Sequence, residues 1–189
     1  IDCARFGDDR SCIFPRQGLI SFNPVIMRGA RTHEIAARVM MAKAKWGSEM
    51  EFVDGTGGFG AGVVDALMQA GHSPQEIHFS SKATDPRYFN KRSEMYFEMA
   101  EWVKRGGSLP QLPELAKELT TPTYTFQNGK LRLEEKDQIK ERIGCSPDLA
   151  DALCLTFALP EMPTFRNEVG VPIKPDYRSD FDPFREDAR

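Results

Sequence analysis

The sequence predicts an α/β fold in which a mixed central sheet is flanked by helices. Three short apolar runs separated by turn residues come first, a pattern typical of an antiparallel meander. A helical stretch, an apolar run that ends in a carboxylate, a second helical stretch and a further apolar run follow. Strands that alternate with helices in this way indicate an α/β sheet.

The composition is that of an ordinary globular domain. The chain has 189 residues, of which 40% are hydrophobic and 28% are charged, so one domain with a substantial core is expected. No apolar run approaches the roughly 20 residues that span a membrane, and we expect no membrane association. The four cysteines show no CxxC spacing and are expected to be reduced thiols rather than zinc ligands.

The first half of the chain contains the predicted central sheet. Strands are expected at residues 1–6, 11–15, 19–27 and 77–79 and in the run that ends at Asp54, and helices at residues 32–47 and 60–70. The first helix carries Ile35 and Val39 near helical spacing, and Gly47 ends it. Pro15 and Pro24 indicate edges or bends in the early strands.

The second half begins with a polar loop, expected at residues 80–90, and ends with a tail, expected at residues 161–189. Between them, four helices are expected at residues 91–104, 113–119, 136–142 and 146–159. Asn128-Gly129 between two short apolar runs predicts a β-hairpin. The last helix has Ser146 at its cap and Pro147 in its first turn, and it is apolar nearly all round, which predicts burial. The tail is rich in proline and charge, so we place the domain at residues 1–160.

The stretch VDGTGGFG at residues 53–60 organises the candidate site. It follows a predicted strand and precedes a helix, so Asp54 stands at the carboxyl end of a strand, where open α/β sheets build their sites. The glycines match the GxGxxG pattern of a dinucleotide site. Against that interpretation, Asp54 would lie beside the pyrophosphate, and no ribose-binding acid follows residues 77–79. A structural turn with a solvated carboxylate is a second alternative, and we favour metal coordination by Asp54.

Three further aspartates are candidate partners of Asp54. Asp2 lies among apolar residues of a predicted strand, where an inward carboxylate needs a partner or a metal ion. Asp148 and Asp151 are one turn apart on a helix predicted to be buried, where like charges repel unless a cation holds them. Asp148 alone could be a first-turn acid favoured by the helix dipole. Together the four carboxylates favour Mg²⁺ or Mn²⁺, and with two ions they suit phosphodiester hydrolysis.

The net charge of −3 bears on nucleic-acid binding. A free-standing nucleic-acid binder is usually basic, so any DNA affinity must come from local basic clusters. The candidate DNA-binding residues in two such clusters are Lys82, Arg87, Lys91, Arg92, Lys130, Arg132, Lys136 and Lys140. A run of charge is usually a solvated surface, but near a carboxylate cluster the same side chains are candidates for phosphate contacts.

Three acidic motifs follow one another along the chain: IDCARFGDD at residues 1–9, VDGTGGFG at residues 53–60 and SPDLADAL at residues 146–153. NKR at residues 90–92 and KD at residues 136–137 lie between the second and the third. In this order they resemble the C-terminal nuclease domain of the large terminase subunit of tailed bacteriophages. The predicted order of three strands, a helix, a strand, a helix and a strand is also that of the ribonuclease H-like fold. The resemblance covers roughly residues 1–160.

The resemblance implies a ribonuclease H-like fold and metal-dependent cleavage of concatemeric double-stranded phage DNA during head packaging. It assigns the catalytic and metal-binding roles to Asp2, Asp54, Asp148 and Asp151, and leaves open which of the last two is the direct ligand. The implied partners are double-stranded DNA, the N-terminal ATPase motor of the same polypeptide, the small terminase subunit and the portal protein. The implied location is the host cytoplasm, at the procapsid portal. Because the chain begins with Ile1 rather than Met, we expect it to be part of a longer polypeptide.

We therefore predict a Mg²⁺- or Mn²⁺-dependent DNA endonuclease domain of a packaging terminase, with two ions expected. One alternative is a junction resolvase of the same fold, which cuts branched DNA. Another is a non-catalytic module that grips DNA or docks on the portal. Cleavage of plasmid compared with cleavage of a four-way junction separates these alternatives.

Overall fold

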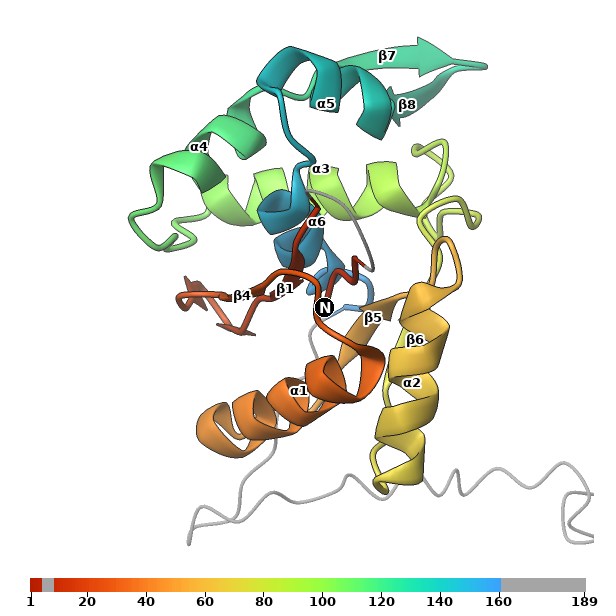
Figure 1. Ribbon diagram of the computed structural model, residues 1–189. Coiled ribbons are helices and arrows are strands. Elements are labelled where there is room, and N and C mark those ends of the chain that lie inside the picture. The colour runs from red at the N-terminus through yellow and green to blue at the C-terminus, as the bar shows by residue number, and fades with distance from the viewer. Residues whose placement is uncertain (5–8, 161–189) are drawn as a thin grey trace, which may run out of the picture.

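A computed structural model describes residues 1–4 and 9–160, so the tail predicted at residues 161–189 lies outside the described part of the chain. Two strand pairs form most of the central sheet (Figure 1). β1 (Ser11–Ile13) pairs antiparallel with β4 (Val25–Met27). β5 (Phe52–Asp54) pairs parallel with β6 (Gln75–Ile77).

The first two residues join these strand pairs into one sheet. Asp2 exchanges two backbone hydrogen bonds with Cys12 of β1, at 3.0 and 2.9 Å. The Ile1 nitrogen donates to the Phe52 carbonyl at 2.7 Å, and the Asp54 nitrogen donates to the Ile1 carbonyl at 2.9 Å. The two hydrogen bonds between Ile1 and β5 have the pattern of parallel strands. The order across the sheet is therefore β4, β1, the first two residues, β5 and β6. The predicted mixed central sheet is confirmed.

One face of the sheet packs against α1 (Thr32–Trp46) and α2 (Phe59–Gln69), which lie in the lower half of Figure 1. α1 ends as predicted at Gly47, which has a left-handed φ of 62°. The core on this face is made of Ile1, Ile13, Ile35, Val39, Val53, Val63 and Leu67.

The other face packs against α6 (Asp148–Leu155), which is itself covered by α3 (Lys91–Lys104) and α4 (Pro113–Thr120). All residues of α6 are buried, as its nearly continuous apolar surface predicted. The core on this side includes Phe14, Phe79, Met95, Leu115, Leu149 and Leu153. Because side chains alternate along a strand, the residues next to Ile1 and Val53, which are Asp2 and Asp54, point to the α6 face.

The remaining elements extend from this layered body. β7 (Tyr124–Gln127) and β8 (Lys130–Leu133) form the predicted hairpin, and α5 (Lys136–Ile143) follows it. The hairpin turn has positive φ at both Asn128 and Gly129, as the Asn-Gly pair predicted. β2 (Arg16–Gln17) and β3 (Ile20–Ser21) form a small second hairpin. Among the described helices, none is long and apolar enough to cross a membrane.

Several predicted boundaries were wrong, and three of the differences have a clear physical cause. Residues 19–27 form two strands, β3 and β4, with Pro24 between them. The last strand of the sheet is β6 rather than residues 77–79, because backbone pairing with β5 selects the earlier residues and Phe79 instead enters the core. α6 ends at Leu155 rather than near residue 159. The backbone nitrogens of residues 156–158 donate to the carbonyl three residues earlier, as in a 3₁₀ turn, instead of four residues earlier, as in an α-helix.

Candidate metal centre

Three of the four candidate aspartates, from the sheet and from α6, lie around the amino group of Lys136. Its Nζ atom lies 3.7 Å from Asp2 Oδ2, 3.9 Å from Asp148 Oδ1 and 2.8 Å from Asp151 Oδ2. Asp54 lies beside Asp2 on the neighbouring parallel strand, and both side chains point to the same face. The structure therefore brings together the four aspartates identified in the sequence.

The glycine turn sets the position of Asp54. The Thr56 nitrogen donates to Asp54 Oδ1 at 2.8 Å, and Gly57 and Gly58 take φ values of 81° and 82° that favour glycine. Gly60 lies directly against the strand end, because a Cβ atom there would stand 1.7 Å from the Asp54 carbonyl oxygen. Because Gly60 has no side chain, the first turn of α2 can pack directly against the end of the strand that carries Asp54.

Asp151 is the most enclosed of the four aspartates, with a relative exposure of 0%. Its Oδ1 atom accepts a hydrogen bond of 2.6 Å from the Tyr96 hydroxyl and lies 3.5 Å from Arg92 Nη2. Its Oδ2 atom receives no hydrogen bond of acceptable geometry from residues 1–4 or 9–160, and faces the Lys136 ammonium. This oxygen is an acceptor suited to a further cation.

Asp148 is held from the other side by Arg10. The Arg10 backbone nitrogen donates to Asp148 Oδ2 at 2.9 Å, and Arg10 Nε lies 3.5 Å from the same oxygen. Asp148 Oδ1 is the atom near Lys136. The carboxylate therefore has one oxygen fixed by Arg10 and one directed at the cluster.

The electrostatics of the cluster separate one aspartate from the other three. Burial raises the pKa of Asp2 to about 7 against the opposing effect of Lys136, and the nearby aspartates add to the rise. Burial also raises the pKa of Asp54 and Asp148. Burial also tends to raise the pKa of Asp151, but the positive charges of Lys136 and Arg92 and the hydrogen bond from Tyr96 hold this pKa below its ordinary value. Asp151 is thus the firmly ionised member, and added positive charge would ionise the others.

The donor set fits a hard divalent cation. Carboxylate oxygens are the ligands that Mg²⁺ and Mn²⁺ prefer. Lys136, Arg92 and Arg10 do not balance the four aspartates, because Arg10 also pairs with Glu114 and Glu118. The buried site therefore has an excess of negative charge that a metal ion would compensate.

Two of the predicted DNA-binding residues, Arg92 and Lys136, contact the aspartates. Arg92 is 8% exposed and also donates to the Glu134 carbonyl at 2.7 Å. In Lys136, 35% of the side chain is exposed. Arg92 is thus a buried partner of Asp151, and a role of either side chain toward DNA stays a prediction.

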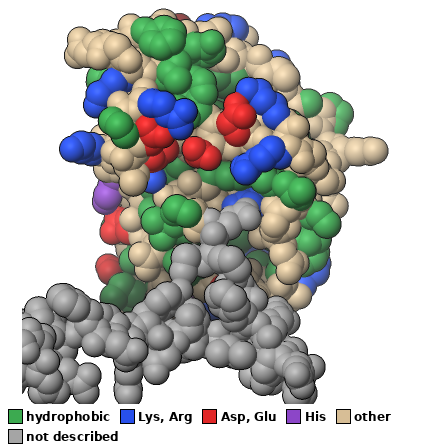
Figure 2. Space-filling model, turned by 180° about the vertical axis from the view of Figure 1, so that it is seen from behind, with side chains coloured by type: hydrophobic (Ala, Val, Ile, Leu, Met, Phe, Trp, Pro, Cys, Tyr) green, Lys and Arg blue, Asp and Glu red, His purple; other side chains and the backbone are tan. Residues whose placement is uncertain are grey.

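The other six predicted DNA-binding residues form no hydrogen bond or ion pair with the four candidate aspartates in the described part of the chain, and they are Lys82, Arg87, Lys91, Lys130, Arg132 and Lys140; of these, Lys82 and Arg87 are exposed and the other four are half-buried. Three of them pair at 2.7 Å with the carboxylates of Asp85, Glu94 and Asp9. Arg132 stacks over Phe89. Figure 2 shows basic side chains interspersed with acidic ones on one face of the molecule, rather than a continuous basic stripe. Their contacts to DNA stay a prediction.

Sequence analysis missed Arg10 and Tyr96, which contact the aspartates, and Glu118, which contacts Arg10. Tyr96 lies within the helix predicted at residues 91–104, and a buried tyrosine hydroxyl usually finds a hydrogen-bond partner. Glu118 follows Leu115 by three residues, so a carboxylate on the buried face of this helix was visible in the sequence. Arg10 carries no comparable signal.

A second group of potential ligands lies next to the cluster. It consists of Glu114, Glu118 and Cys145, each of which has one ligand atom within 4.8 Å of those of the other two. Arg10 pairs with both glutamates, at 2.8 and 3.1 Å. Because the guanidinium already compensates these carboxylates, we assign no metal to this group.

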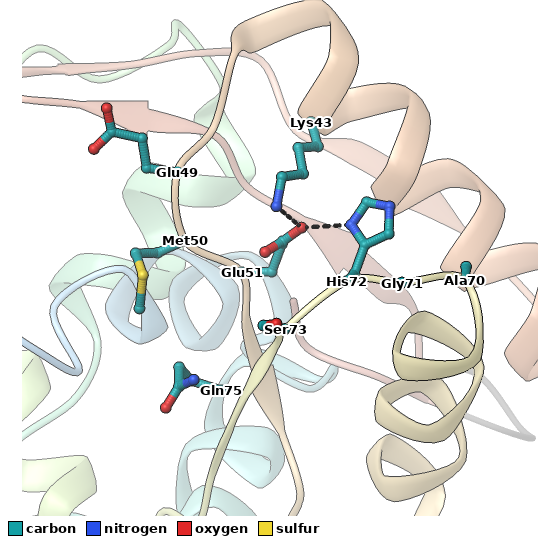
Figure 3. A pocket seen from close by; sticks show the side chains of 9 residues that line it. All are labelled: Lys43, Glu49, Met50, Glu51, Ala70, Gly71, His72, Ser73 and Gln75. Atoms are coloured by element: carbon teal, nitrogen blue, oxygen red, sulfur yellow. Dashed lines mark hydrogen bonds and ion pairs between the residues drawn. The ribbon is translucent and has the colours of Figure 1, made fainter. Parts of the chain in front are cut away.

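A cavity of about 420 Å³ lies at the opposite end of β5 from Asp54 (Figure 3). One oxygen of its buried carboxylate, Glu51 Oε1, lies 2.6 Å from Lys43 Nζ and 2.9 Å from His72 Nδ1. The cavity holds no second carboxylate that converges on Glu51, since Glu49 points away from it in Figure 3.

Comparison with known proteins identifies the fold. No protein-family model matches the sequence, and no curated protein matches it. The nuclease domain of the large terminase subunit gp2 of bacterial virus Sf6 is 23% identical, with a TM-score of 0.70 over 85% of this chain and 86% of that chain. A mutant of that domain, with manganese and beta-thujaplicinol, has a TM-score of 0.65 at 23% identity, over 85% of this chain and 86% of that chain.

A more distant structure gives the same result. The large terminase nuclease from thermophilic phage G20c, with bound magnesium, is 14% identical and has a TM-score of 0.54 over 82% of this chain and 84% of that chain. The described strands and helices agree with the predicted α/β architecture. The chain therefore has the ribonuclease H-like fold of phage terminase nuclease domains.

Proposed function

We propose that the chain is the metal-dependent DNA endonuclease domain of a viral packaging terminase, cutting concatemeric double-stranded DNA by two-metal phosphodiester hydrolysis. The observation that carries the proposal is the cluster of Asp2, Asp148 and Asp151 around the Lys136 ammonium, with Asp54 beside Asp2 on the same face of the sheet, on this fold. The similar Sf6 and G20c nucleases are described with manganese and with magnesium, ions that suit the same carboxylate donors.

The four aspartates would hold the metal ions. When bound, such ions supply an activated water and stabilise the leaving oxygen of the phosphodiester. Tyr96 and Arg92 hold Oδ1 of Asp151, which leaves Oδ2 directed into the cluster. The glycines that follow Asp54 leave room beside its carboxylate for a phosphate group to approach.

Lys136 has two roles in this proposal. In the metal-free fold its ammonium holds the aspartates together against their mutual repulsion. Because its side chain is partly exposed, it can also turn outward to a phosphate oxygen of DNA. The motor, the small terminase subunit, the portal protein and a location at the procapsid portal in the host cytoplasm belong to the same proposal, and the resemblance of the acidic motifs supports them.

The test is cleavage of supercoiled and linear plasmid in Mn²⁺, with EDTA and the Asp54→Asn variant as controls. We expect Mn²⁺-dependent cleavage of both plasmids and none in either control. Preferential cutting of a four-way junction would favour the resolvase alternative. DNA binding without cleavage in Mg²⁺ or Mn²⁺ would favour a module that only grips DNA.

A further inference from the structure

Glu118 is a fully buried carboxylate on α4 that the proposed reaction does not use directly. Its two oxygens have different partners. Oε1 accepts from Arg10 Nη2 at 3.1 Å, and Oε2 accepts from the Ala150 backbone nitrogen at 2.8 Å. A buried carboxylate is costly unless both oxygens are satisfied, so this arrangement fixes the three groups relative to one another.

The contact with Ala150 fixes the beginning of α6. The first amides of a helix have no acceptor within the helix, and Pro147 provides no side-chain cap here. Glu118 supplies that acceptor from a different helix. Because Asp148 is the first residue of α6, the contact also sets where the Asp148 backbone lies.

The contact with Arg10 fixes the Asp148 side chain. The Arg10 guanidinium is held by Glu118 on Nη2 and by Glu114 on Nη1, while its Nε faces Asp148 Oδ2 at 3.5 Å. The Arg10 backbone nitrogen donates to the same oxygen. With Oδ2 occupied in this way, Oδ1 is the Asp148 atom that faces Lys136 and the other aspartates.

We propose that Glu118 is a positioning residue of the metal centre, which acts through Arg10 and the Ala150 amide to direct Asp148 toward the other aspartates. The inference rests on the proposed function, since it requires the aspartates to bind metal. Residues that orient a metal ligand from behind commonly change metal affinity by tenfold or more when replaced.

The test compares two glutamines on the same helix. Glu118→Gln keeps the side-chain shape but has one acceptor oxygen in place of two, so it cannot accept from both the Ala150 amide and the Arg10 guanidinium. Glu114→Gln is the matched control, because Glu114 also pairs with Arg10 but has 48% of its side chain exposed, and it forms no hydrogen bond or ion pair with α6. We expect Glu118→Gln to weaken Mn²⁺ binding about tenfold and Glu114→Gln less than twofold, by calorimetric titration at pH 8.

Two readouts separate positioning from general stability. A purely structural role of Glu118 would lower the melting temperature in EDTA while leaving Mn²⁺ affinity unchanged well below that temperature, which would overturn the inference. In cleavage assays of the Glu118→Gln variant, positioning predicts a higher half-saturating Mn²⁺ concentration. It also predicts that most of kcat returns at saturation.

A second variant, at Arg10, breaks the same series of contacts between Glu118 and Asp148. It tests the inference even if Glu118→Gln does not fold. Arg10→Gln keeps the backbone donor to Asp148 and removes the guanidinium. We expect the same loss of Mn²⁺ affinity, with no further loss in the double variant, whereas additive losses would show independent effects and contradict the inference. If the wild-type protein binds no Mn²⁺, the proposed function itself fails. If it binds Mn²⁺ and both variants bind equally well, only the role of Glu118 fails.

Discussion

The ammonium of Lys136 lies 2.8 Å from Oδ2 of Asp151, a buried oxygen to which no described residue donates a well-aligned hydrogen bond. The same ammonium is within 4 Å of two other aspartates. A lysine therefore provides, in the metal-free fold, part of the positive charge that the carboxylates require.

Replacing Lys136 by alanine should weaken the metal-free fold and strengthen Mn²⁺ binding. Without the ammonium the aspartates repel one another, and the free energy of unfolding in EDTA should fall by about 2 kcal/mol. This is less than for a fully buried pair, because 35% of the lysine side chain is exposed. The more negative cluster should then bind a divalent cation several-fold more tightly.

Chemical unfolding in EDTA and calorimetric titration with Mn²⁺ measure these two effects. Lys140→Ala is the matched control, since Lys140 lies one turn further along α5 and pairs instead with Asp9. Weaker Mn²⁺ binding by the Lys136→Ala protein would contradict the assignment of this lysine as a competitor of the metal.

Asp54→Asn should abolish cleavage while leaving the fold intact. Removing one charge from a cluster of like charges relieves repulsion, so metal-free stability should hold or rise slightly. Stabilisation by Mn²⁺ should shrink, because an ion that binds only the folded state stabilises it by mass action. Asp65→Asn, an exposed position on α2, should behave as wild type. Full activity of Asp54→Asn at saturating Mn²⁺ would refute the assignment of Asp54.

Metal-free stability should decline as pH rises from about 4 to 7. The folded-state pKa of Asp2 is about 7 because the carboxyl is buried, well above its ordinary value of 3.8. Between these values the folded state keeps a proton that the unfolded state has lost, so folding is favoured at the low end, and the contribution is gone above pH 7. Burial raises the pKa of Glu118 to about 7 with the same sign.

Melting temperatures in EDTA from pH 5 to 8 test this dependence, and Asp2→Asn should flatten it. Mn²⁺ affinity should change in the opposite direction and improve as pH rises through 7, because a ligand carboxylate must release its proton. A pH-independent Mn²⁺ affinity over this range would mean that Asp2 is not a ligand.

The hairpin formed by β7 and β8 should contribute to DNA binding rather than to metal binding. Replacing Lys130 and Arg132 by alanine should weaken DNA binding at low salt and lower the salt-dependence slope by roughly 0.9 for each phosphate contact removed. Arg38→Ala with Lys45→Ala, on α1 at the other end of Figure 1, is the matched control. Binding titrations at several salt concentrations give the slope, and an unchanged slope would mean that the hairpin faces away from DNA.

Gly60→Ala should destabilise the protein by about 3 kcal/mol and disturb Asp54. The new Cβ atom would stand 1.7 Å from the Asp54 carbonyl oxygen, a backbone atom that cannot move without shifting the strand. Gly62→Ala in the same helix meets only a Thr32 methyl group at 3.1 Å and should be far milder. Thermal unfolding with and without Mn²⁺ compares the two, and equal stability of both variants would contradict this account of the turn.

The aspartates were predictable from the sequence because each breaks a local pattern. A carboxylate among the apolar residues of a strand, or at the end of a strand before a glycine turn, is costly without a partner, which drew attention to Asp2 and Asp54. A pair of acids on a helix that is otherwise apolar did the same for Asp148 and Asp151. The order of strands and helices followed from periodicity, and only the element boundaries were set by backbone pairing that side chains do not encode.

The partners of the aspartates were not predictable in the same way. Lys136 and Arg92 stand in polar sequence, where nothing distinguishes a lysine that reaches DNA from one that turns into an acid cluster. The direction of such a side chain depends on contacts between residues far apart in the chain, as in the 59 positions that separate Arg92 from Asp151. Glu118 and Arg10 are linked to Asp148 by contacts of the same long range.

The backbone bonds between Ile1 and β5 join residues that are more than 50 positions apart, and the strands that they join carry Asp2 and Asp54. If these strands separate, the sheet loses its central pairing and the cluster loses two carboxylates in the same opening event. Any cation that bridges Asp2 and Asp54 therefore slows that opening by mass action. The amide proton of Asp54, which donates to the Ile1 carbonyl, should exchange with solvent more slowly when a diamagnetic ion such as Mg²⁺ is added. Hydrogen exchange at this single amide would report occupancy of the centre without any nucleic acid present.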